Sequence, residues 1–183
     1  MTLNSSLKYI PEFRLEKVKS NFKKTQVKDL GTAIDFCRKF WSTDISIYVE
    51  PFGGAFGVFF SLDFNKYSNV DFIYNDVNYL NYNLFNQLQG NKDFIDLVKS
   101  TNVDEDLYKF SLKGIITTKD DTLLALQWLI VLTCSNPYEI GQASWKGNRE
   151  FDIFKMKHRA YKPKIDRITN IYNTDYKDII NKY

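Results

Sequence analysis

The sequence predicts an α/β fold in which a sheet carries helices on both faces. Residues 47–49 form an apolar run that ends at Glu50 and passes through the Gly53-Gly54 turn into a second apolar run with helical spacing. Residues 72–74 form another strand-like run, which ends in polar residues including Asp76 before a further helical pattern. Two successive strand ends that each carry a carboxylate are typical of a doubly wound α/β site for a nucleoside cofactor.

The glycine turn and the second acidic turn each have two interpretations. Paired glycines let the backbone approach a ligand closely, and the next helix presents its unpaired N–H groups to that ligand. Most glycine-rich turns, however, only close a strand and bind nothing. The Asp76 carboxylate accepts hydrogen bonds from both hydroxyls of a ribose, or else Asn75 or Asp76 caps the helix that follows.

Composition fits one domain of 183 residues, and a net charge of +3 excludes few partners. Cys37 and Cys134 fall within apolar helical patterns, so we expect buried, reduced thiols. No metal-ligand spacing occurs, and His158 is the only histidine, which argues against a zinc site. The N-terminus lacks a signal-peptide core. We therefore expect no membrane contact and a location in the cytoplasm, or in the host cytoplasm if a phage or virus encodes the chain.

Helices and strands are predicted in the following order before residue 91. Residues 5–24 form a basic segment that leads into a helix, and Thr32 caps a helix whose apolar residues, from Ala33 to Trp41, recur at three- and four-residue spacing. We then expect a strand at about 46–49, a helix through about Leu62, a strand at about 70–74 and a helix over 78–88 that Gly90 terminates.

After residue 91 the patterns predict mainly helices. Residues 91–112 hold two short helical patterns, and the nearly all-apolar run 122–132 predicts a helix buried on all sides. This run is too short to span a bilayer. Residues 167–172 alternate as a strand, and residues 177–182 predict a last helix.

Positive charge is concentrated in residues 144–167, a segment that looks loop-like. It holds eight Lys and Arg residues against three acids, or +5, which leaves −2 for the remainder of the chain. Aromatic residues are interleaved with these charges, which suits phosphate contact together with packing against nucleic acid. A solvated basic surface is the alternative, and composition favours neither. The interleaved aromatic residues are Trp145, Phe151, Phe154 and Tyr161.

These motifs resemble the first half of the Dam-like, or α-group, DNA adenine-N6 methyltransferases, which use S-adenosylmethionine (AdoMet). The similar residues are Glu-Pro-Phe-x-Gly-x-x-x-Val-Phe-Phe at 50–60, Asp-Phe-x-x-Tyr at 63–67 and Asn-Asp-x-Asn at 75–78. Phe56 stands where the family has its third motif glycine, and Leu-Lys-Tyr at 7–9 is kept without the Gly-Gly-Lys that follows it in the family. The resemblance implies a partial Rossmann-like AdoMet methyltransferase sheet with a helical, basic DNA-recognition insertion.

The resemblance also implies a cofactor pocket. The ribose-binding acid of the family falls at Asp76. Asp175 matches the acid that accepts from the exocyclic N6 of the AdoMet adenine, with the Tyr176 ring beside it, although Asp175 also suits the cap of the last helix and both roles can hold at once. The pocket residues implied in this way are Tyr9, Glu50, Pro51, Phe52, Gly53, Gly54, Asp76, Asn78, Asp175 and Tyr176.

The basic segment occupies the position of the family's Arg/Asn-Gly-x-Phe loop that enters DNA, so the resemblance implies contact with double-stranded DNA. It divides the chain into a first part of the core (1–90), a helical target-recognition insertion (91–164) and a return to the core (165–183). The implied DNA-binding residues are Trp145, Lys146, Asn148, Arg149, Lys155, Lys157, Arg159, Lys162 and Lys164.

The catalytic Asp-Pro-Pro-Tyr of the family, which ends a further strand, has no counterpart in these 183 residues. Residues 135–138 read Ser-Asn-Pro-Tyr, but they hold one proline and follow a helix, so a turn is the better interpretation. We therefore assign no catalytic residue and expect no methyl transfer by this chain alone. The strand at 47–49 would be an unpaired apolar edge, which predicts a second polypeptide that supplies the missing strands and tetrapeptide. The alternative is a catalytically inactive, methyltransferase-like binding or structural subunit of a larger assembly.

Overall fold

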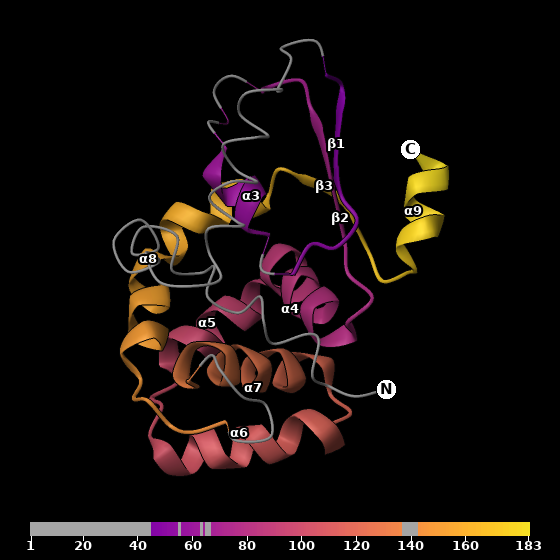
Figure 1. Ribbon diagram of the computed structural model, residues 1–183. Helices are drawn as coiled ribbons and strands as arrows, with labels where there is room; N and C mark the ends of the chain where they lie inside the picture. Colours follow the sequence, from indigo (N-terminus) through magenta and orange to yellow (C-terminus); the bar gives the residue numbers. More distant parts are fainter. Residues whose placement is uncertain (1–44, 55, 63, 65–66, 137–142) are drawn as a thin grey trace.

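The computed structural model describes residues 45–183 except 55, 63, 65–66 and 137–142 (Figure 1). The expectations for Tyr9, Cys37 and the helix after Thr32 therefore lie outside the described residues, as do Pro137 and Tyr138. Over the described part, the chain has the expected α/β character, with a small parallel sheet and helices on both of its sides.

The sheet in the described residues has three parallel strands in the order β1-β2-β3. They are β1 (Ile47–Glu50), β2 (Asp71–Asn75) and β3 (Ile168–Tyr172), each within one residue of the range expected from sequence. β1 pairs with β2 from Ile47 opposite Asp71 to Glu50 opposite Tyr74. Because β1 is an outer strand of this sheet, its other edge is not paired by any described strand.

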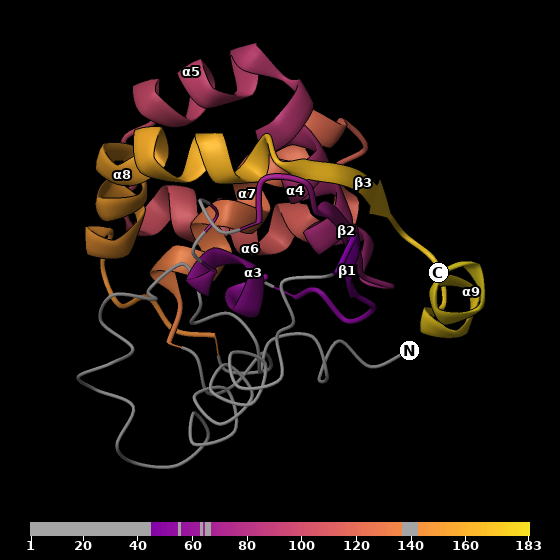
Figure 2. The same ribbon diagram turned by 90° about the horizontal axis from the view of Figure 1, so that it is seen from above.

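A helix follows each strand. Figures 1 and 2 show α9, which follows β3, alone on one side of the sheet among the labelled helices, while α3, α4 and the other helices lie on the opposite side. The connection from β2 to β3 contains the helical insertion. The helices are α3 (Gly57–Ser61), α4 (Tyr79–Gly90), α5 (Lys92–Ser100), α6 (Glu105–Thr117), α7 (Asp121–Cys134), α8 (Arg149–Ile165) and α9 (Tyr176–Lys182).

Helix α7 is the centre of the insertion. Every residue from Leu124 to Cys134 is buried, which confirms the helix expected to be covered on all sides. No helix in the described ranges is long and apolar enough to cross a bilayer. Cys134, at the end of α7, is a buried free thiol as expected, and burial raises its pKa to about 11.

The basic segment is a helix, which corrects the expectation of a loop-like region. α8 runs for 17 residues and buries Phe151, Phe154 and Ile165. Their helical spacing was hidden by the many Lys and Arg residues between them, but one apolar face is enough to dock a helix on a core. Pro163 lies inside its last turn.

A glycine lies at the contact between α6 and α7. A Cβ added at Gly114 would lie 2.3 Å from Gln127 Nε2, so a side chain there would displace the buried amide of Gln127. We expect Gly114→Ala to lower the free energy of unfolding by about 1–3 kcal/mol, the usual cost of overpacking a well-filled contact. Urea unfolding followed by circular dichroism measures this change.

Gly90, the last residue of α4, provides the matched control. A Cβ added there meets nothing within 4 Å, so Gly90→Ala should leave stability unchanged or raise it by up to about 1 kcal/mol. Equal effects of the two substitutions would show that Gly114 is not a packing position.

Candidate functional site

The turns after the three strands meet at one edge of the sheet, and the side chain of Asn75 joins them. This side chain is fully buried. Its Nδ2 donates to Pro51 O at 2.9 Å and to Thr174 O at 3.1 Å, while its Oδ1 accepts from Thr174 N at 3.0 Å. Gly53 N donates to Asn75 O at 2.7 Å. The candidate site is therefore assembled from three segments of the chain, near residues 50, 75 and 175.

Asp76 links the two acidic turns. It is 8% exposed, and its Oδ2 accepts from Gly54 N at 2.8 Å and from Asn81 Nδ2 at 3.0 Å. Its Oδ1 accepts from Asn78 N at 2.8 Å. A carboxylate oxygen accepts about two hydrogen bonds, and the described residues supply only one to Oδ1. Among the described residues, one acceptor position of Asp76 Oδ1 is therefore unfilled.

Asn78 is the N-cap of α4, so the capping role considered for Asn75 or Asp76 belongs to Asn78. Its side-chain Oδ1 accepts from Leu80 N at 3.1 Å. Its Nδ2 is buried and, in the part of the chain that the structure describes, has no hydrogen-bond partner. Leaving a buried donor unpaired costs about 1–3 kcal/mol. Asn78 and Asp76 are two residues apart in one turn, so this turn carries both an unpaired donor and an acceptor that the described residues fill only in part.

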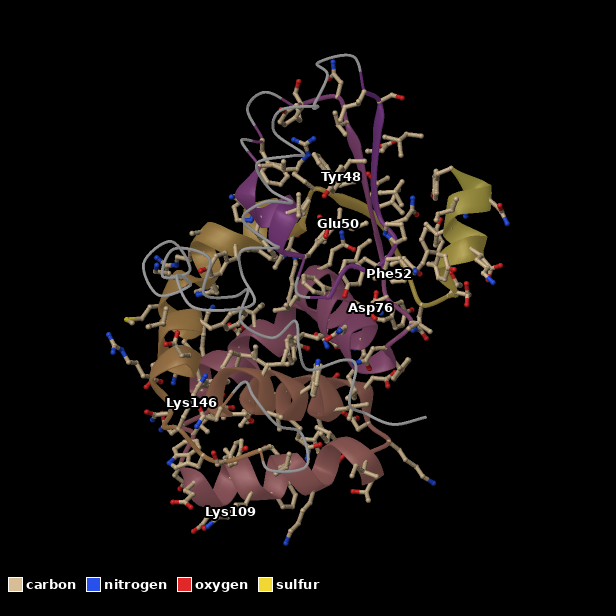
Figure 3. All side chains as sticks on the ribbon, in the orientation of Figure 1. Tyr48, Glu50, Phe52, Asp76, Lys109 and Lys146 are labelled. Atoms are coloured by element: carbon tan, nitrogen blue, oxygen red, sulfur yellow. The ribbon has the colours of Figure 1, made fainter. Side chains whose placement is uncertain are left out.

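The carboxylate of Glu50 makes hydrogen bonds within the protein itself. Its Oε1 accepts from Tyr48 Oη at 2.5 Å and from Phe59 N, in the first turn of α3, at 2.9 Å. A carboxylate at this place stabilises the helix N-terminus. Figure 3 shows Glu50 between Tyr48 and the part of the site that contains Asp76.

The ring of Tyr74 packs against the glycine turn. A Cβ added at Gly53 would lie 2.2 Å from the Tyr74 ring, and Tyr74 Oη donates to Gly54 O at 2.7 Å. Phe56 adopts a left-handed conformation, with φ of 60°, and is fully buried with its ring stacked on Phe59 at 4.1 Å. Gly53 is therefore required by the Tyr74 ring, and Phe56 adopts a backbone conformation that usually favours glycine.

Two aromatic rings form an exposed surface at the same edge. Phe52, after β1, is 69% exposed and lies 4.8 Å from the ring of Tyr176, after β3, with 35° between the ring planes. Asp175 caps α9 by accepting from Lys177 N at 2.9 Å, as the sequence predicted, and is exposed. The structure thus brings together nine of the ten predicted cofactor residues, and Tyr9 lies outside the described residues.

The predicted DNA-binding residues do not form one open basic face. Three lysines of α8 reach the ends of three other helices: Lys155 Nζ donates to Thr101 O at 2.9 Å, Lys162 Nζ to Gln89 O at 3.2 Å and Lys164 Nζ to Phe60 O at 2.7 Å. These carbonyls lie at the C-termini of α5, α4 and α3, where cations are favourable.

The other predicted DNA-binding residues differ in exposure. Trp145 is half-buried with its ring 5.4 Å from Tyr108. Asn148 Nδ2 donates to Val103 O at 3.0 Å. Lys146 Nζ is buried and has no hydrogen-bond partner among the described residues. Lys157 is half-buried, whereas Arg149 and Arg159 are exposed.

Sequence reasoning missed Asn81, Tyr74 and the supporting role of Asn75. Asn81 carried a detectable signal, because it lies one turn before Leu84 on the apolar side of α4, where an uncompensated amide would be costly. An asparagine directly after the apolar run of residues 72–74 is a similar signal for Asn75. The contact between Tyr74 and Gly53 joins residues that are distant in sequence, so the sequence carried no signal for it.

No protein-family model matches the sequence, and no curated protein sequence is significantly similar to it. What the site binds therefore has to be argued from its geometry and from the sequence motifs.

Proposed function

We propose that this chain binds AdoMet at the carboxyl edge of its sheet, as the cofactor- and DNA-binding part of a DNA adenine-N6 methyltransferase. The observation that carries the proposal is the pairing of an unpartnered buried donor with an unfilled acceptor. Asn78 Nδ2 has no described partner, and Asp76 Oδ1 keeps one acceptor position in the same turn. A ribose hydroxyl both donates and accepts, so it satisfies both groups.

The rest of the pocket follows from the three turns. The exposed rings of Phe52 and Tyr176 offer a surface for the adenine, and the exposed carboxylate of Asp175 lies next to Tyr176 as an acceptor for its amino group. Pro51, Gly53 and Gly54 lie in the turn after β1, and Glu50, at the start of this turn, bonds the first turn of α3. Bound AdoMet would supply a methyl group on its sulfonium, with the N–C bond forming at adenine N6 as the S–C bond breaks, so that S-adenosylhomocysteine and a proton from N6 would leave and no covalent enzyme intermediate would be needed.

DNA contact is the second part of the proposal. The exposed guanidinium groups of Arg149 and Arg159 support it, because exposed cations on one helix suit phosphate contact. Lys155, Lys162 and Lys164 support it less, since their ammonium groups already serve other helices.

A second polypeptide that carries further strands and an Asp-Pro-Pro-Tyr sequence is the third part of the proposal. Its support is that β1 is an outer strand of the described sheet and exposes Ile47 by 43%. Natural proteins cover such edges. A flipped adenine would be bound in the pocket that the two chains complete.

A non-catalytic binding subunit is the second candidate. It is favoured by the absence of an Asp-Pro-Pro-Tyr sequence, and of Gly-Gly-Lys after Leu-Lys-Tyr at 7–9, from these 183 residues. The two candidates share the cofactor site and differ in methyl transfer.

Calorimetric titration with AdoMet and with its demethylated product, S-adenosylhomocysteine, tests the cofactor site. We expect binding by the unmodified chain, and Phe52→Ala should weaken it about tenfold or more because an exposed stacking surface is lost. Phe110→Ala is the matched control, since Phe110 is 61% exposed on α6, away from the strand ends. Absence of binding by the unmodified chain would refute the proposal.

Titration of a DNA duplex at several salt concentrations tests the DNA contact. Arg159→Gln should lower affinity and reduce the salt slope by about 1. Lys155→Met should instead lower the free energy of unfolding with the slope unchanged, because Lys155 Nζ bonds Thr101 O and pairs with Asp152 at 3.3 Å. If only Lys155→Met reduced the salt dependence of DNA affinity, the DNA would lie on the other face of α8.

Transfer of a labelled methyl group to DNA separates the two candidates. We expect none by the chain alone and transfer to adenine N6 when a co-expressed polypeptide supplies Asp-Pro-Pro-Tyr. Light scattering should then show a complex of the two chains. Cofactor binding without any transfer in that complex would favour the non-catalytic subunit.

A further inference from the structure

A buried chain of hydrogen bonds connects the candidate ribose site to the helical insertion. Asn81 Nδ2, on α4, donates to Asp76 Oδ2 at 3.0 Å, and Asn81 Oδ1 accepts from Trp128 Nε1, on α7, at 2.9 Å. Asn81 is 8% exposed and Trp128 1% exposed. The chain therefore lies out of water, where each of its bonds is strong and each broken bond is costly.

The indole decides which way the amide of Asn81 faces. An indole N–H only donates, so the group of Asn81 that meets it has to be the carbonyl oxygen. The amide nitrogen is then left to donate to Asp76. Together with Gly54 N, it holds Oδ2 at two points and leaves Oδ1 to Asn78 N and to a ligand.

We propose that Asn81 and Trp128 are positioning residues for the nucleoside hydroxyl, and that α7 of the insertion in this way sets the orientation of the Asp76 carboxylate. The inference rests on the proposed function, since it assigns the direction of the acceptor within that site. It gives the insertion a role in cofactor binding besides any contact with DNA.

Asn83 offers a matched control on the same helix. It is 2% exposed, and its Nδ2 donates to Asp121 O, at the start of α7, at 2.7 Å. Its described hydrogen bonds reach Asp121 and Gln87 and not Asp76. Replacing Asn83 therefore breaks a comparable buried link between α4 and α7 without touching the acid.

The experiment compares Asn81→Leu, Trp128→Phe and Asn83→Leu by calorimetry with S-adenosylhomocysteine and its 2′,3′-dideoxy analogue, after correction for the folded fraction. Asn81→Leu and Trp128→Phe should each weaken S-adenosylhomocysteine about five- to tenfold, the effect of one buried hydrogen bond. Asn83→Leu should stay within about twofold. Affinity for the dideoxy analogue should not change in any variant, because that ligand has no hydroxyl for Asp76.

The outcomes separate the two levels of the proposal. Equal losses with Asn83→Leu, or equal losses for both ligands, would reduce Asn81 to a general structural role and overturn the inference while the proposed function stands. Unchanged affinity in both Asn81→Leu and Trp128→Phe would overturn it as well. Trp128→Phe keeps an aromatic side chain and removes the donor together with part of the buried indole, so, after correction for the folded fraction, it decides the matter if Asn81→Leu does not fold. Absence of binding by the unmodified chain would remove the proposed function first, and this inference with it.

Discussion

The geometry of the site depends on the hydrogen bonds of the Asn75 side-chain amide. This amide lies at the end of the central strand and binds the turn after β1 through Pro51 O and the turn after β3 through Thr174. These segments are 24 and 99 residues away along the chain. An amide has both donors and acceptors, so one buried side chain satisfies backbone groups of two turns at once. An aspartate of the same shape has no N–H to offer.

The acids at the strand ends serve the fold before they serve any ligand. Glu50 supports the start of α3, Asp175 caps α9, and Asp76 ties the glycine turn to α4. The parallel strands explain why these acids have structural roles. Each strand is followed by a helix whose N-terminus points at the same edge of the sheet, and a helix N-terminus prefers a negative charge. The same arrangement of helix N-termini suits a polar ligand, so the proposed function assigns binding roles to the residues that also serve the fold.

Local patterns in the sequence predicted the parts of the fold that depend on local chemistry. The strands, the buried α7 and the cap at Asp175 all follow from periodicity or from a residue that bonds its own neighbours. The Asn81–Trp128 bond joins residues 47 apart, and the contact of Gly53 with Tyr74 joins the turn after β1 to β2. Such pairings are fixed by tertiary packing, which a single sequence does not display.

The charge of residues 144–167 illustrates how the same composition supports two chemistries. On a flexible loop, its cations would be available to phosphates. On α8, the ammonium groups of Lys155, Lys162 and Lys164 instead reach carbonyls at the C-termini of α5, α4 and α3. A helix C-terminus has unpaired carbonyls and a partial negative charge, so it competes with DNA for these cations. These contacts add to the buried apolar face of α8 in holding it against its neighbours. In the proposed function, any DNA contact by α8 is left to cations outside these contacts, of which Arg149 and Arg159 are exposed.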